Sequence, residues 1–512
     1  MTTATQGVRT RAPVRVRDSA GALTARLRPH WPLLIVLGLG ALVRLLTMVA
    51  YAPALLFPDS WGYIATAYKG AIVGLPTIHP VGYPLLVHLL TLPDRSLLEL
   101  VAFQHLAGLG AGVAIYAALI RGRVPRWGAT AAASLVLLDG YAITLEQYVM
   151  SDTFFDVTML AAALVLVWPR LAQAGGVVPA TASAQRDDRI WLRAAICGLL
   201  LAFAALEREA APFTIPVFLI YLAWIRAGAR AFVAFLLALL IPLSAYSAAV
   251  NSKYQVFGLT ATSGWTLYGR VGGFADCTGV TLEAAARPLC ESKAQRASHP
   301  SAPDWYVWGP SPAQRVFDPA NQSVSKVAST NATLLSFSET IIRHQPLDFI
   351  GATLGDFLRY FTPGATAYND AVSATSLPLR ARDEAKAAAT QKLDLPGLHL
   401  SVRSPSRLVR WYRGSFHVPR PLLALLALAA LLAVLMRVSG RREILLLGGT
   451  GVCLLLGTAA TGGFGLRYLI PAVPLLAIGG SLAITQIAQR ARRSTTEHDA
   501  RTDADKSATM EL

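Results

Sequence analysis

Charged side chains that could do chemistry stand at the ends of long apolar segments. Asp59 follows the first apolar segment by only a few residues, in the run Phe57-Pro-Asp-Ser-Trp-Gly-Tyr63. At the edge of a bilayer its carboxylate would lie at the depth of a lipid headgroup, where it could act as a general base. Aspartate is also a preferred N-cap residue, and a short helix is expected over 60–68. Taken alone, Asp59 is more often such a cap, and both interpretations stay open.

Two more acidic residues, Glu146 and Asp152, lie in the run Leu145-Glu-Gln-Tyr-Val-Met-Ser-Asp-Thr-Phe154, between two later apolar segments. Carboxylates at a helix boundary can bind a divalent cation, tune the pKa of a base, or hold acceptor hydroxyls. The alternative is that Asp152 caps the next helix. Asp59 and Asp152 are the candidate ligands if a metal binds. The sequence requires none, and it leaves any cofactor unknown.

Arg208 lies between two glutamates in another short turn, Ala205-Leu-Glu-Arg-Glu-Ala210. Charges that face lipid are costly, so charged residues at such depth are often functional. Arg208 could pair with Glu207 or Glu209. It could instead bind a phosphate through two parallel N–H bonds.

Arg467 and Tyr468 lie in the last such turn, Gly462-Gly-Phe-Gly-Leu-Arg-Tyr-Leu-Ile-Pro471. Glycines leave backbone N–H groups open, and together with an arginine they suit a phosphate or pyrophosphate. The alternative is that the arginine only snorkels to the bilayer surface. We favour a functional role, because Arg467 stands on the side of the membrane that is poor in basic residues.

The elements that must position these residues are apolar segments of about 20 residues, the length that crosses a bilayer. The chain is 54% hydrophobic and only 15% charged, against about 25% charged in a soluble domain. The sequence therefore predicts an all-α polytopic membrane protein with about ten transmembrane helices and an extracytoplasmic mixed domain. The segment 80–92 is broken by prolines, so we expect an interfacial or re-entrant element there. The candidate spans are 31–51, 97–120, 128–145, 153–169, 191–206, 211–227, 230–250, 419–437, 443–460 and 467–487.

Arginines gather in every second short loop, whereas the other loops are acidic. This is the positive-inside pattern, and it predicts both termini in the cytoplasm and the candidate site residues outside. It also explains the net charge of +16 without nucleic acid, which we do not expect as a partner. The arginine-rich and alanine-rich composition favours a bacterium, and therefore its plasma membrane.

The expected organisation has five parts. A basic cytoplasmic tail is followed by a transmembrane catalytic module with its first outside loop at 52–96, and then by an extracytoplasmic domain. The last two parts are C-terminal transmembrane helices and a disordered cytoplasmic tail. In order, the five parts span 1–30, 31–250, 251–418, 419–487 and 488–512.

Cys277 and Cys290 both lie in the predicted extracytoplasmic domain. Two cysteines of one loop usually form a disulfide in an oxidising compartment. A metal site is less expected, because no histidine or third cysteine lies close in the sequence.

Several of these features together resemble the C-type glycosyltransferase superfamily, in the branch of protein O-mannosyltransferases and lipid A aminoarabinose transferases. They are an aspartate after the first helix, a short aromatic helix, and the run His79-Pro-Val-Gly-Tyr-Pro-Leu85. The acidic residue after Met-Ser at Asp152 and the Arg-Tyr-x-x-Pro run that begins at Arg467 are similar too. Ser60 follows Asp59 where the protein mannosyltransferases have an Asp-Glu pair, so the acceptor stays open among glycan, lipid and protein.

The resemblance implies transfer of a sugar from a polyprenyl-phosphate donor to an acceptor hydroxyl, by one inverting displacement at the outer face of the membrane. In this family the acidic residue of the first loop, here Asp59, is the catalytic base. A basic residue in the region of the third turn, here Arg208, commonly meets the donor phosphate. Asp152 or Glu146 would orient groups or hold a metal. The remaining candidates are Arg467 and Tyr468 at the phosphate and His79, Tyr63 and Tyr83 around the substrate cavity.

The competing hypothesis is a flippase or transporter of lipid-linked sugars without covalent chemistry. Transporters often contain inverted repeats and helices broken at the bilayer midplane. No repeat stands out in this sequence, and the charged candidates cluster at the outer face. The pattern therefore favours the enzyme, whose partners would be the lipid-linked donor, the bilayer and the acceptor.

Overall fold

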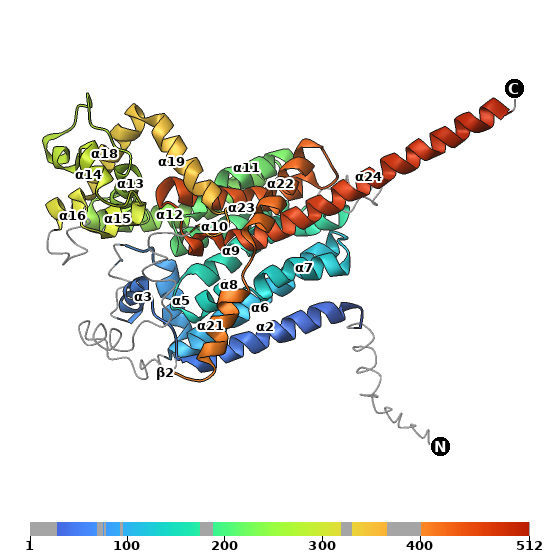
Figure 1. Cartoon of the computed structure of the whole chain (residues 1–512), viewed down its shortest axis with the longest axis horizontal. Coiled ribbons are helices and arrows are strands. Elements are labelled where there is room, and N and C mark those ends of the chain that lie inside the picture. The colour runs from blue at the N-terminus through green and yellow to red at the C-terminus, as the bar shows by residue number, and fades with distance from the viewer. Residues whose placement is uncertain are drawn as a thin grey trace, which may run out of the picture.

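The computed structural model describes residues 28–68, 75, 78–92, 96–174, 188–318, 330–365 and 401–510. Nearly all of the regular structure in these residues is helical (Figure 1). Two short strands, β1 (Tyr51–Ala52) and β2 (Ser401–Val402), pair antiparallel with Tyr51 opposite Val402. Most of the predicted N-terminal tail and parts of the segments 52–96 and 251–418 lie outside the described residues.

Seven helices in the described part are long and apolar enough to cross a membrane, and two bent helix pairs raise the count to nine. Each of the ten predicted spans corresponds to a helical segment, so the all-α polytopic fold is confirmed. The predicted span 211–227 is the weakest, because η3 (Ala211–Thr214) and α11 (Ile215–Trp224) together are short for a bilayer. The seven long helices are α2 (Trp31–Ala50), α6 (Leu97–Arg121), α9 (Asp152–Ala174), α10 (Ile190–Glu207), α12 (Ala229–Tyr254), α23 (Arg441–Thr461) and α24 (Ala472–Met510).

One predicted straight span, 128–145, is a bent pair made of α7 (Arg126–Leu137) and α8 (Gly140–Gln147). The bend of 43° occurs at Asp139, which lies between the two helices. Its carboxylate accepts hydrogen bonds from the backbone N–H groups of Ala142 (2.7 Å) and Val418 (2.6 Å). Asp139 therefore caps α8, and the bend directs the following turn toward the candidate site. The second bent pair is α21 (Ser406–Ser415) and α22 (Arg420–Leu435).

The helical bundle has two distinct ends (Figure 1). The start of α2 and the end of α24 lie at one end, and a group of short helices lies at the other. In the described part of the predicted first outside loop, two short helices form, α3 (Pro58–Tyr68) and α5 (Gly82–Leu90). The latter falls in the predicted interfacial element 80–92 and, at nine residues, is too short to span.

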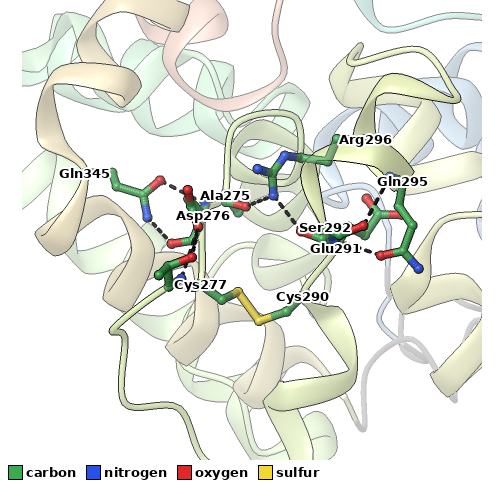
Figure 2. The surroundings of a disulfide bond; sticks show 10 residues. Ala275, Asp276, Cys277, Cys290, Glu291, Ser292, Gln295, Arg296 and Gln345 are labelled. Carbon is green, nitrogen blue, oxygen red and sulfur yellow. Dashed lines mark hydrogen bonds between the residues drawn. A yellow bond between two sulfur atoms is a disulfide. The ribbon is translucent and has the colours of Figure 1, made fainter.

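The group of short helices, which we call the outer module, has its own hydrophobic core around Trp265, Tyr268 and Phe337. Cys277 and Cys290 form the predicted disulfide in this module (Figure 2). Helix α19 (Pro346–Arg359) leads from the outer module back to the membrane-spanning helices. The module contains α13 (Ser263–Gly272), η4 (Ala284–Leu289), α14 (Lys293–Ala297), α15 (Pro303–Trp308), α16 (Pro312–Phe317) and α18 (Asn331–His344).

The C-terminal segment differs from the sequence prediction. The sequence predicts a disordered tail over 488–512, but α24 continues as far as Met510. This stretch is rich in Ala and Arg and lacks Gly and Pro, so nothing in it breaks the helix.

Candidate active site

The predicted base, Asp59, lies in the first turn of α3 and faces an arginine from the far end of the chain. Its Oδ2 accepts a hydrogen bond of 2.7 Å from Arg467 Nη1, across 408 residues of sequence. The start of α3 is held instead by Ser60, whose Oγ accepts from the N–H of Phe57 and donates to the carbonyl of Val149, both at 2.8 Å. Asp59 therefore directs its carboxylate at Arg467, whereas Ser60 bonds to the backbone at the start of α3.

A second ion pair stands beside the first. Arg208 binds Asp152, at the start of α9, rather than either of its neighbours Glu207 and Glu209. The guanidinium carbons of Arg208 and Arg467 lie 5.3 and 5.0 Å from the ring centre of Tyr468. Arg467 also donates to the Tyr468 hydroxyl at 3.1 Å. The structure therefore brings two carboxylates and two guanidinium groups together around one tyrosine.

Exposure separates the members of this cluster. The side chains of Asp59, Arg467 and His79 are 18%, 23% and 22% exposed, and that of Arg208 is 14% exposed. Asp152 is only 1% exposed. A substrate can reach the first four side chains, whereas Asp152 is buried and contacts Arg208.

The three residues predicted to line a substrate cavity are not equivalent. His79 Nε2 lies 3.9 Å from Asp59 Oδ1, and its ring stacks on Tyr63 at 4.5 Å. Tyr63 is buried, with its hydroxyl 3.2 Å from Ser151 Oγ. Tyr83 is fully buried and donates to Gln104 Oε1 at 2.8 Å. Tyr83 therefore supports the site from within the protein core, which corrects its predicted place in the cavity wall.

Neighbouring charges set the protonation of the two groups that lie outside the membrane-spanning segments. Burial disfavours the charged form of Asp59, but the positive charge of Arg467, with a smaller contribution from His79, outweighs it and lowers the pKa of Asp59. Burial lowers the pKa of His79, so its imidazole is neutral at pH 7. In the free protein Asp59 is therefore an ionised and weak base.

Glu146 lies apart from this cluster. Its two oxygens accept from Arg44 Nε and Nη2, each at 2.7 Å, and His105 Nδ1 lies 2.7 Å from Oε2. All three side chains are buried, and a Cβ at Gly108 would lie 2.0 Å from Glu146 Oε1. The predicted catalytic role of Glu146 has no support in this geometry, because its carboxylate is occupied by an internal ion pair.

Sequence reasoning missed Arg44 and His105, although a signal was present. Arg44 interrupts the apolar run of the first spanning helix, and a charge at that depth needs a partner. It also donates to the carbonyl of Leu137 at 2.7 Å, next to the bend between α7 and α8. Arg44 therefore holds the helical framework behind the site.

A cavity of about 30 Å³, with room for a water molecule or two, lies behind the ion pairs. Its wall includes Asp139, Glu146, Asp152 and Asp156. Within the described residues, no group of three or more His, Cys, Asp or Glu side chains is gathered as a metal-binding set. The two candidate ligands, Asp59 and Asp152, are each paired with an arginine.

Of the comparisons with known proteins, the family match bears on the predicted resemblance. Residues 91–227 match the family model of dolichyl-phosphate-mannose-protein mannosyltransferases. No curated protein sequence matches the chain. Among solved structures, an archaeal oligosaccharyltransferase, AglB from Archaeoglobus fulgidus, is 12% identical with a TM-score of 0.38, over 93% of this chain and 52% of its own. ArnT from Cupriavidus metallidurans, bound to undecaprenyl phosphate, is 15% identical with a TM-score of 0.33, over 87% of this chain and 77% of its own.

The chain thus spans about half the length of the archaeal enzyme that it resembles. The matched segment 91–227 contains Asp152 and Arg208, one of the two ion pairs of the site. This match confirms the predicted resemblance to the protein O-mannosyltransferases over this segment of the chain.

Proposed function

We propose that the protein transfers a sugar from a polyprenyl-phosphate donor to an acceptor hydroxyl at the outer face of a bacterial plasma membrane. The observation that carries this proposal is the cluster of Asp59, Arg467, Asp152 and Arg208 around Tyr468. It combines a reachable carboxylate with two cations at the ends of membrane-spanning helices. The family match over 91–227 supports the same chemistry.

The two arginines suit the phosphate of such a donor. A sugar linked to a polyprenyl phosphate is a phosphodiester with one negative charge, and breaking the bond to the sugar adds a second charge to the departing phosphate. Arg208 and Arg467 flank the Tyr468 ring, so both can donate to the same phosphate group. Their charges stabilise the developing charge more than the starting one, and this difference lowers the barrier.

Asp59 becomes a better base when the donor binds. In the free protein Arg467 holds Asp59 through the bond of 2.7 Å, and this lowers the pKa of Asp59. A donor phosphate competes for the same guanidinium group. When Arg467 turns toward the phosphate, Asp59 loses its cation and its pKa rises. The base is therefore activated only when the sugar is in place.

The chemical step is then a single displacement. The acceptor oxygen attacks the anomeric carbon opposite the phosphate, and its proton passes to Asp59. The bond from the anomeric carbon to the phosphate oxygen breaks, and the phosphate leaves with the electron pair. One displacement inverts the anomeric configuration. Phosphate is a good leaving group, so no general acid is needed.

The other predicted site residues do not take part in the displacement itself. Asp152 is buried and holds Arg208, so it positions the second cation. Glu146 balances the charge of Arg44 inside the helical framework. His79, neutral and stacked on Tyr63, lies within reach of an acceptor beside Asp59.

The same proposal gives the orientation of the protein in the membrane. Both termini would be cytoplasmic, and the outer module, part of 251–418, would be extracytoplasmic. The start of α2 and the end of α24 lie at the end of the bundle opposite this module (Figure 1). An impermeant thiol reagent applied to intact cells should label a cysteine introduced in the outer module. Labelling of one introduced near the C-terminus would contradict this orientation.

The direct test is transfer by the purified protein. The protein in lipid nanodiscs is incubated with radiolabelled polyprenyl-phosphate sugars and acceptor fractions from the cell envelope. Release of unlabelled polyprenyl phosphate together with a labelled acceptor is the expected result. Movement of intact donor across proteoliposomes without bond cleavage would establish the transporter instead.

A further inference from the structure

We infer that Tyr360, with the Asp356 ion pair beside it, positions Arg467 for the donor phosphate and thereby connects the outer module to the site. This inference rests on the proposed function. Asp356 lies near the C-terminal end of α19 and Tyr360 caps it, and neither touches Asp59, so their role would be positioning rather than catalysis.

The turn Gly462–Gly465 leads directly into Arg467, and Tyr360 holds it. Tyr360 is fully buried, and its hydroxyl donates to the carbonyl of Gly463 at 3.2 Å. Its ring centre lies 5.0 Å from that of Phe464. One side chain therefore fixes two successive residues of the turn.

Gly463 is where three elements meet. Its φ of +80° is a conformation that side chains disfavour. A Cβ at this position would lie 2.6 Å from Cγ of Pro303 in the outer module and 3.3 Å from Oδ2 of Asp356 in α19. The turn is thus packed directly against the module and against α19.

Asp356 joins the same elements by charge. It is buried and pairs with Arg270 of α13, and its other oxygen accepts from Arg359 Nη1 at 3.1 Å. The guanidinium carbon of Arg359 lies 4.6 Å from the ring centre of Phe464. A helix of the outer module, α19 and the turn before Arg467 therefore share one network.

The other end of α19 is tied to the disulfide loop. Gln345, just before α19, donates to the carbonyl of Asp276 at 2.6 Å and accepts from its N–H at 3.0 Å (Figure 2). Asp276 precedes Cys277, which is bonded to Cys290. Arg296 closes this loop by donating to the carbonyls of Ala275 and Glu291. Contacts therefore continue from the disulfide through α19 to the phosphate-binding arginine.

This arrangement matters because Arg467 has to change partners. If the donor phosphate draws it away from Asp59, that contact no longer holds the guanidinium. The turn and its network then determine where Arg467 points. Loosening the turn should weaken donor binding without altering the Asp59 side chain itself.

The test is Tyr360→Phe, which removes one hydroxyl and keeps the ring. Its matched control is Tyr306→Phe, which removes a buried hydroxyl that donates to Glu291 at 3.0 Å inside the outer module. Binding of a polyprenyl phosphate is measured for each variant in nanodiscs, together with thermal unfolding. One hydrogen bond corresponds to a change of about two- to tenfold in affinity. We expect Tyr360→Phe to weaken binding by that factor, and Tyr306→Phe to leave it unchanged at a similar loss of stability.

Gly463→Ala extends the test, because the added Cβ must displace Pro303 or Asp356 and should weaken binding further. Equal binding in Tyr360→Phe and wild type, while Arg467→Ala binds poorly, would refute this inference and leave the proposed function intact. Equal binding in wild type and Arg467→Ala would refute the proposed phosphate site itself. Equal weakening by Tyr360→Phe and Tyr306→Phe would mean that both residues act only through stability, which also overturns the inference.

Discussion

The substitution Asp59→Asn separates the proposed base from every structural role of the same side chain. Asparagine keeps the size of aspartate, and its carbonyl can still accept the 2.7 Å hydrogen bond from Arg467. Asparagine also caps helices about as well as aspartate. The substitution therefore removes the negative charge and the basicity and changes little else.

Asp59→Asn should lower turnover and, in the opposite direction, should not weaken donor binding. General base catalysis is typically worth about 10²–10⁴-fold, so turnover at saturating donor should fall by that factor. Donor binding should not weaken, because a neutral amide competes with the phosphate for Arg467 less strongly than a carboxylate does. The pair is partly exposed, at 18% and 23%, so its loss is worth at most about 1 kcal/mol. This corresponds to donor binding up to about fivefold tighter.

The assay is single-turnover transfer of radiolabelled sugar, with donor affinity measured on the same preparation. Asp348→Asn is the matched control, since Asp348 is an exposed aspartate in the first turn of α19, away from the site. It should leave both quantities unchanged. Turnover of Asp59→Asn above about a third of normal would refute the base assignment, because so small a loss lies far below the expected effect. Donor binding about tenfold weaker, a loss of about 1.4 kcal/mol, would refute the competition between Asp59 and the phosphate.

Three other measurements bear on the remaining roles. Arg467→Ala should raise the donor KM and also lower kcat, because it removes a phosphate ligand that acts in the ground state and in the transition state; a change in kcat alone would contradict this. Asp59 must be ionised to act, so activity falls as the pH drops through its pKa. The acidic limb of kcat/KM reports the free protein and should lie below the ordinary pKa of aspartate. The acidic limb of kcat reports the complex with donor and should lie at higher pH. Glu146→Gln should destabilise the protein by about 3–5 kcal/mol, because it leaves the charge of Arg44 buried without its partner; normal thermal unfolding with lost turnover would restore Glu146 as a catalytic residue.

The positions of the helices along the chain could be predicted well from the sequence, because the thickness of a bilayer fixes how long an apolar segment must be. The same constraint placed the candidate residues at helix ends, and the alternation of basic loops put Asp59, Asp152, Arg208 and Arg467 on one side. Their convergence in the structure follows from being at the same ends of packed helices. The bend at Asp139 was not predicted, although the Asp139-Gly140 pair is a turn signal inside this otherwise apolar span.

The pairing of charges could not be predicted, because it depends on packing between distant segments. Arg208 has a glutamate on each side in the sequence, yet its partner is Asp152 at the start of α9. Glu146 and Asp152 lie six positions apart in one polar turn and look alike in the sequence. Glu146 lies in α8 and points inward toward Arg44, whereas Asp152 begins α9 and lies beside Arg208.

The charge balance of the site explains why so many ionised groups can lie at the edge of a bilayer. Two aspartates and two arginines cancel in the free protein, and His79 adds no charge at pH 7. An isolated arginine at this depth is costly, and each of the two is paired with an aspartate. In the proposed mechanism, the carboxylate of Asp59 supplies the anion for Arg467 until a donor phosphate replaces it. The exchange keeps Arg467 compensated throughout, and the carboxylate that it releases is the group that must accept the proton. Binding of the donor and activation of the base are then one event, so a site without donor holds no active base.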